Sequence, residues 1–93
     1  MSDNPMRPIR VDGRVHRRHP DVTDDDVRYA WSHIVRSMRR DGKAEPTQYL
    51  AVGVAPDGRW LEMLAIIDAG RGTWHIYHAM TAQRKALREL GLI

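Results

Sequence analysis

The chain of 93 residues contains no cysteine, so it can form neither a disulfide framework nor a thiolate metal site. No apolar run approaches the roughly 18 to 20 residues of a membrane span. Residues 1–8 are polar, carry two prolines and lack the apolar block of a signal peptide. We therefore expect a flexible N-terminal tail at 1–8, a single domain at 9–93 and a cytoplasmic protein that does not contact a membrane.

Lysine is also scarce, and arginine takes its place. Thirteen of the fifteen basic residues are arginine, the formal net charge is +3 and the sequence pI is 9.8. Arginine binds phosphate or carboxylate groups through two parallel hydrogen bonds. The excess of arginine indicates a polyanionic partner or an acidic protein partner, or it reflects only the base composition of the genome. Composition alone does not choose among these interpretations.

The longest predicted helix begins after Thr23, a good N-cap that is followed by three aspartates at 24–26. Asp26 has the spacing of a capping-box partner, and the aspartates place negative charge at the positive end of the helix dipole. Apolar residues then recur at helical spacing as far as Met38, and Gly42 is a natural stop. The sequence predicts a helix over about 24–41.

A run of β-strands follows this helix. Alternating or apolar segments, separated by turns that contain proline, aspartate or glycine, predict three strands. The strands are expected at 48–54, 60–68 and 73–79, after a short strand at 9–11 and one or two helical turns within 13–19. Thr81 is the predicted cap of a final helix at about 82–90. The fold class is α+β: a short N-terminal strand and helices, a three-stranded antiparallel meander and a C-terminal helix.

The last strand interleaves two histidines with two aromatics in Trp74-His75-Ile76-Tyr77-His78. Histidine can both take and give a proton near neutral pH. In a regular strand His75 and His78 face opposite sides, which argues against a zinc site built on both. His75 and Tyr77 form either a half-exposed polar pair or a general acid or base beside a base-stacking tyrosine. His78 is either a capped histidine at the strand end or a second acid or base.

Basic side chains near this strand are candidates for holding a phosphate. Arg84 and Arg88 lie four residues apart on the last helix, where they form either a solvated face or a phosphate clamp. Lys85 has the same spacing to Glu89, as in a surface ion pair. Further candidates for contact with an RNA backbone are Arg59, Arg18 and His19.

Other common site signatures are missing from the sequence. It contains no glycine-rich phosphate loop and no nucleophile elbow. The aspartates at 24–26 are explained by the start of a helix. We therefore predict neither a metal site nor a cofactor.

Three segments resemble BrnT-type toxins of type II toxin–antitoxin systems. Arg18-His19-Pro20-Asp21-Val22-Thr23 is similar to the step before that family's main helix. Segments 49–53 and 57–61 look like its first hairpin. His75-Ile76-Tyr77-His78-Ala79-Met80, followed by a basic helix, looks like its final strand and closing helix. The resemblance covers about residues 9–90 through short motifs.

This resemblance implies a RelE/ParE-like ribonuclease fold. It implies a metal-independent endoribonuclease that inhibits translation until a cognate antitoxin protein covers it, as a homo-oligomer or in a toxin–antitoxin hetero-oligomer. It also implies catalysis by His75 or His78, with Arg84 as phosphate stabiliser, Tyr77 as stacking platform and Lys85 as auxiliary cation.

One position departs from the family pattern. The family tends to end its last strand in serine-alanine-arginine, whereas this chain has His78-Ala79-Met80. Another basic residue such as Arg84 then replaces the missing arginine, the chemistry uses histidine, or the activity is lost. Two alternatives stay open: a non-catalytic basic module that docks an acidic protein or nucleic acid, and a structural dimer.

Overall fold

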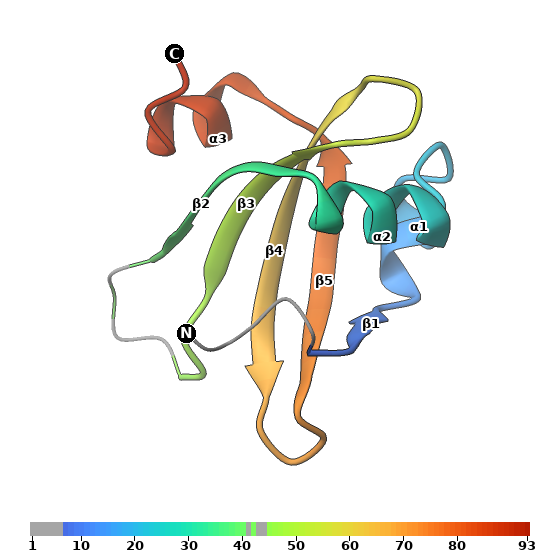
Figure 1. Cartoon of the computed structure of the whole chain (residues 1–93), viewed down its shortest axis with the longest axis vertical. Coiled ribbons are helices and arrows are strands. Elements are labelled where there is room, and N and C mark those ends of the chain that lie inside the picture. Colours follow the sequence, from blue (N-terminus) through green and yellow to red (C-terminus); the bar gives the residue numbers. More distant parts are fainter. Residues whose placement is uncertain (1–6, 41, 43–44) are drawn as a thin grey trace.

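The computed structural model describes residues 7–40, 42 and 45–93. Within them an α+β fold is built from a five-stranded sheet and three helices (Figure 1). The strands are β1 (Ile9–Val11), β2 (Ile34–Arg39), β3 (Tyr49–Val54), β4 (Trp60–Asp68) and β5 (Thr73–Thr81). The helices are α1 (Arg14–Arg18), α2 (Asp24–Ser32) and α3 (Arg84–Glu89). None of these helices combines the length and the apolar character that crossing a membrane requires.

The sheet has the strand order β1-β5-β4-β3-β2. β1 runs parallel to β5, and every other pair of neighbours is antiparallel. Most of the tail predicted at 1–8 lies outside the described residues. Pro8 is described, and its carbonyl accepts a hydrogen bond from the Trp74 amide at 2.8 Å. This hydrogen bond places Pro8 beside β5, immediately before the first residue of β1.

The first long helix is half as long as the sequence predicts. Its N-terminus agrees with the prediction, because Thr23 and Asp26 form a reciprocal capping box with two hydrogen bonds of 3.0 Å. Its C-terminus does not: α2 ends at Ser32, and residues 34–39 form β2 instead. The amide of Val54 donates to the His33 carbonyl at 3.2 Å, which starts the β2–β3 ladder. Pairing with β3 thus overrides the helical spacing of the apolar residues.

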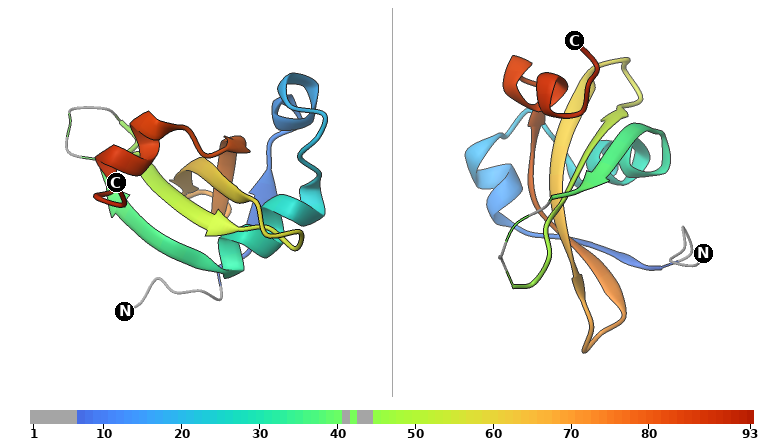
Figure 2. Two further views of the ribbon diagram at one scale, coloured as in Figure 1. Left: turned by 90° about the horizontal axis from the view of Figure 1, so that it is seen from above. Right: turned by 90° about the vertical axis from the view of Figure 1, so that its left-hand side faces the viewer.

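Helices cover both faces of the sheet (Figure 2). The face that packs on α2, here called the α2 face, carries the larger core. Its buried members are Val15, Val22, Val27, Ala30, Ala51, Ala55, Leu61, Met63, Ala65, Ile76 and Ala79. The opposite face, here called the α3 face, carries a smaller core of Leu50, Val52, Ala86 and Leu90. Because α3 is short, the sheet on this side is covered only in part.

A β-bulge at Tyr77 changes the direction of the side chains on β5. His75 pairs with Ile66 and His78 pairs with Leu64, so the three residue intervals from 75 to 78 on β5 lie opposite only two intervals on β4. A bulge inserts one residue and shifts the alternation of faces that follows. Both histidines therefore lie on the α3 face, and the expectation that they point to opposite sides of the sheet is wrong.

The start of the last helix also differs from the prediction. β5 continues to Thr81, and α3 begins at Arg84 with Gln83 as its N-cap. The cap comes from a distant strand, because the Glu62 carboxylate accepts the Gln83 amide at 2.8 Å. Thr81 is therefore not the cap residue. The Glu62 carboxylate of β4 instead holds the N-cap residue Gln83 and so fixes the start of α3 over the sheet.

Candidate functional site

A cavity of about 490 Å³ opens on the α3 face, between α3 and the sheet. This volume lies within the range of small-molecule sites in proteins. Its polar lining comes from the residue after β2, from β4, from β5 and from the α3 region. The lining residues are Arg40, Leu50, Glu62, Leu64, His78, Gln83, Lys85, Ala86 and Glu89. Residues that are far apart in the sequence thus meet in one hollow.

His78 is held in the cavity by Glu62. Its Nε2 lies 2.9 Å from Oε2 of the Glu62 carboxylate, and the two side chains are 24% and 13% exposed. A carboxylate accepts hydrogen bonds, so this contact places the proton of a neutral imidazole on Nε2. Oε1 of Glu62 binds the Gln83 amide and cannot turn away. The Nδ1 atom of His78 is consequently left with its lone pair, as a proton acceptor.

Two cations line the same cavity. Arg40 donates from Nε and Nη2 to the two carboxylate oxygens of Glu89, each at 2.9 Å. Such a two-bond fork also matches the oxygens of a phosphate. Lys85 brings an ammonium group from α3. The site therefore combines an oriented imidazole with a guanidinium and an ammonium.

A second imidazole lies close to His78. The ring centroids of His19 and His78 are 6.2 Å apart, with the ring planes nearly perpendicular at 89°. His19 follows the last residue of α1, where its amide donates to the Val15 carbonyl at 2.8 Å. The contact brings the loop after α1 to the edge of the candidate site. It links the first quarter of the chain to the last strand.

His75 belongs to a separate histidine–carboxylate pair. Its Nε2 lies 3.0 Å from Oδ2 of Asp12, and its side chain is 16% exposed. Asp12 also accepts the Arg14 amide at 2.9 Å. That backbone hydrogen bond, together with His75 and the Arg14 guanidinium, lowers the pKa of Asp12 from 3.8 to about 2. His75 therefore helps to join β5 to the start of α1, away from the cavity lining.

The Asp12 cluster makes folding stability depend on acid pH. Because the pKa of Asp12 is lower in the folded chain than in the unfolded chain, the cluster stabilises the fold above about pH 4. This contribution is lost as the pH falls towards 2. We expect Asp12→Asn to lower the free energy of unfolding by clearly more at pH 6 than at pH 2.5, where only about a third of the contribution remains, as measured by urea denaturation. Equal losses at both pH values would contradict this, and Glu45→Gln, at an exposed position outside the helices and strands, is the control.

Tyr77 lies near His75, with 6.4 Å between the two ring centroids. Its hydroxyl is buried and has no hydrogen-bond partner within the part of the chain that the structure describes. Burial raises the pKa of Tyr77, and Arg40 partly offsets the increase. The tyrosine thus faces the same side of the sheet as the cavity. Its hydroxyl, however, is not presented to solvent.

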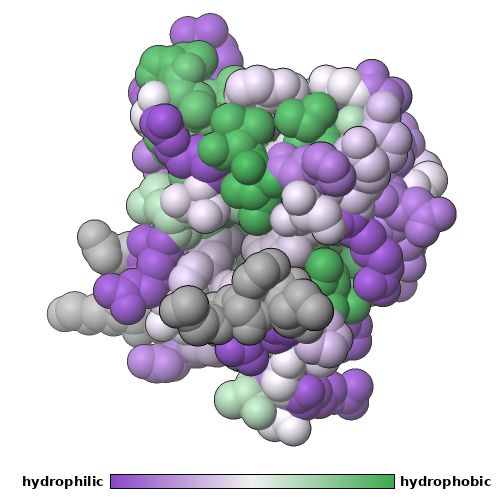
Figure 3. All heavy atoms as spheres, viewed as in Figure 1, coloured by the Kyte–Doolittle hydropathy of each residue, from purple (hydrophilic) through white to green (hydrophobic). Residues whose placement is uncertain are grey.

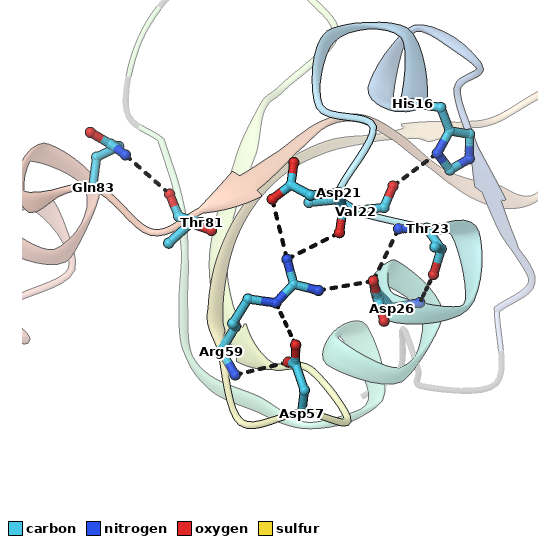
Figure 4. A network of polar contacts seen from close by, with 9 residues as sticks. All are labelled: His16, Asp21, Val22, Thr23, Asp26, Asp57, Arg59, Thr81 and Gln83. Carbon is cyan, nitrogen blue, oxygen red and sulfur yellow. Dashed lines mark hydrogen bonds and ion pairs between the residues drawn. The ribbon is translucent and has the colours of Figure 1, made fainter.

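Arg59 has a structural role instead of the predicted contact with RNA. Its guanidinium binds Asp57 at 2.7 Å, Asp26 at 3.0 Å and Asp21 at 3.4 Å (Figure 4). It also donates to the Asp21 carbonyl at 3.1 Å. These contacts raise the pKa of Arg59, with the hydrogen bond to Asp57 as the largest cause. The side chain ties the β3–β4 turn to the start of α2, and these contacts use four of its five N–H donors.

The predicted phosphate stabiliser also lies elsewhere. Arg84 is exposed and is not part of the cavity lining formed by the described residues. The same holds for Arg88 and Arg18. The guanidinium in the cavity comes instead from Arg40, which the sequence placed at the end of a long helix. Recognising Ile34 and Val35 as a β-branched strand start would have brought Arg40 to the sheet.

The described residues contain no group of three or more histidine, aspartate or glutamate side chains arranged to hold a metal ion. The chain matches no family model, and comparison with curated proteins and with solved structures finds no similar protein. The geometry of the cavity is therefore the main ground for a proposal about function.

Proposed function

We propose that the chain is a metal-independent endoribonuclease that acts through the cavity on the α3 face. The main observation behind this proposal is that the hydrogen-bonded pair of His78 and Glu62 lines the same cavity as Arg40 and Lys85. The resemblance of three segments to BrnT-type toxins supports the same function. In this proposal the protein is the toxin of a toxin–antitoxin pair with a RelE/ParE-like fold. It cleaves RNA in the cytoplasm, and a cognate antitoxin protein silences it.

The two imidazoles divide the proton transfers of the reaction. Nδ1 of His78 takes the proton of a ribose 2′-hydroxyl, and the 2′-oxygen attacks the adjacent phosphorus. The bond from phosphorus to the 5′-oxygen breaks, and protonated His19 gives its proton to that oxygen. The products are a 2′,3′-cyclic phosphate and a 5′-hydroxyl. The two imidazoles are neighbours, with 6.2 Å between their ring centroids, and each group contributes typically about 10²–10⁴-fold to the rate.

Arg40 and Lys85 stabilise the charge that develops on the phosphate. Fixed cationic donors in a partly dry site act most strongly on the transition state. When RNA binds, Arg40 releases the Glu89 carboxylate and donates its two parallel hydrogen bonds to phosphate oxygens instead. Met80, which stands where the resembled family tends to have arginine, pairs with Glu62 at the cavity edge. Arg40, the residue after β2, thus supplies the guanidinium that β5 lacks.

Incubation of the purified chain with total RNA in EDTA tests this function. We expect fragments that end in 2′,3′-cyclic phosphate and begin with 5′-hydroxyl groups, and we expect 2′-deoxy oligonucleotides to stay intact. RNA that is bound but never cut would contradict the proposal and would support the non-catalytic binding module. RNA that is neither bound nor cut would contradict both.

A further inference from the structure

β2 is an exposed edge of the sheet. It is the last strand in the sheet order, and five of its six residues are exposed. Ile34 and Val35 are 37% and 43% exposed, which is unusual for apolar side chains of this size. Figure 3 shows apolar surface gathered over the region of β2 and α3. Long open edges invite pairing with another strand, and proteins usually shorten or cover them.

The backbone of β2 presents hydrogen-bonding groups to this open side. The Arg40 amide donates to the Gln48 carbonyl at 2.9 Å, so these two residues form a hydrogen-bonded pair with β3. Such pairs alternate along an antiparallel ladder with pairs whose amides and carbonyls point outward. Arg39 and Ser37, one and three residues before Arg40, therefore direct their N–H and C=O groups away from β3. They form a short ladder ready for a further strand.

The charge of β2 selects the kind of strand that fits. Residues 34–40 contain three arginines and no acidic residue. Arg36 donates to the carbonyls of Leu90 and Gly91, and Arg40 binds Glu89. Arg39 is exposed and has no hydrogen-bond or ion-pair partner in the described part of the chain. A second copy of β2 would bring the same three positive charges to the edge, and this repulsion disfavours a pair of β2 strands.

We propose that the β2 edge binds an extended acidic segment of another protein by strand addition. The backbone groups of Ser37 and Arg39 hold the segment, its apolar residues cover Ile34 and Val35, and a carboxylate pairs with Arg39. This surface would act whether or not the cavity cleaves RNA. A failure here therefore leaves the ribonuclease proposal untouched.

Amide exchange measured by NMR reports this binding residue by residue. The ligand is a short synthetic peptide that alternates glutamate with valine and threonine. We expect the amides of Ser37 and Arg39 to exchange freely in the chain alone and to become protected with peptide. The amides of Arg36 and Met38, which face β3, are protected in both states. Absence of peptide binding, or protection that does not follow this alternation, would overturn the proposal.

Two substitutions separate the backbone contribution from the charge contribution. Ser37→Pro removes an outward N–H and leaves the pairing with β3 intact, because proline is tolerated on edge strands. Its control is Ser37→Ala. Arg39→Glu reverses the exposed charge, and Arg71→Glu makes the same change at the β4–β5 turn. We expect Ser37→Pro and Arg39→Glu each to weaken peptide binding by about tenfold or more, equivalent to about 1.4 kcal/mol.

The control variants should bind like the unmodified chain, and circular dichroism confirms that each variant is folded. Equal affinities for Arg39→Glu and Arg71→Glu would show that only net charge matters and would overturn the proposal. A dimer in light-scattering measurements that Ser37→Pro dissociates would also overturn it, because a second copy would then occupy the edge.

Discussion

Replacement of His78 by alanine is expected to lower the rate of RNA cleavage by about 10²–10⁴-fold. The imidazole is oriented by Glu62 and shares the cavity with Arg40 and Lys85, so its removal deletes the proposed base and leaves the cations in place. Initial rates of cleavage of a fluorogenic oligoribonucleotide, measured in EDTA for both proteins, give this ratio of rates. Little change in substrate affinity should accompany the loss.

Glu62→Gln tests the orientation of the same imidazole. A glutamine can still accept the Gln83 amide and keep α3 in place, but its amide group donates towards Nε2 and favours the other tautomer of His78. We expect a lower rate together with an unchanged melting temperature. His33→Ala, at an exposed histidine that stacks on Tyr29, is the control and should keep the full rate. A folded His78→Ala protein with the unmodified rate would refute the proposed base.

Gly53→Ala is expected to produce the largest loss of stability among single conservative changes in the sheet. A Cβ atom at Gly53 would lie 2.0 Å from the carbonyl oxygen of Ala30 and 2.8 Å from its carbonyl carbon. Both are backbone atoms of a buried helix turn, so no side chain can move aside. Overpacking of this kind typically costs 1–3 kcal/mol and occasionally more. We expect about 3 kcal/mol or more, a fall in melting temperature of at least about 12 °C.

Thermal unfolding, monitored by circular dichroism, measures the fall in melting temperature. Gly70→Ala is the matched control, because a Cβ there would meet only the Asp68 side chain at 3.6 Å. The control should melt near the unmodified chain. Equal melting temperatures for the two variants would show that α2 does not pack directly on the backbone of β3.

Features set by neighbouring residues could be predicted from the sequence. The strand over 60–68 agrees with β4, because its apolar run is bounded on both sides by turns. The capping box at Thr23 and Asp26 also formed, since its two hydrogen bonds lie within four residues. In both cases local chemistry alone decides the conformation.

Features set by distant contacts could not be predicted. The apolar spacing beyond Ser32 suits either a helix or the strand that pairs with β3, and only the position of β3 decides between them. The bulge at Tyr77 likewise depends on how β5 fits against β4. That single inserted residue brings His75 and His78 to one face. The alternation of a regular strand predicts the opposite.

The same limit applies to the candidate site. The sequence singled out His78 and Lys85, and the structure places both in one cavity. The sequence also suggested Arg84, which lies outside the cavity lining formed by the described residues. The sequence did not suggest Arg40, which reaches the cavity only because the segment before it is a strand and not a helix. Glu62 is the one acidic residue between Trp60 and Ile67 of β4. Its two partners, His78 and Gln83, become visible only once β5 and α3 are placed beside β4.

NMR titration with a 2′-deoxy oligonucleotide, which lacks the attacking hydroxyl, tests most directly whether the cavity is the site that holds RNA. We predict that the imidazole signals of His78 and His19 and the Nε–H signal of Arg40 shift together with one dissociation constant, while the ring of His33 does not respond. Shifts at the exposed arginines alone, with His78 and Arg40 unchanged at saturation, would contradict the account.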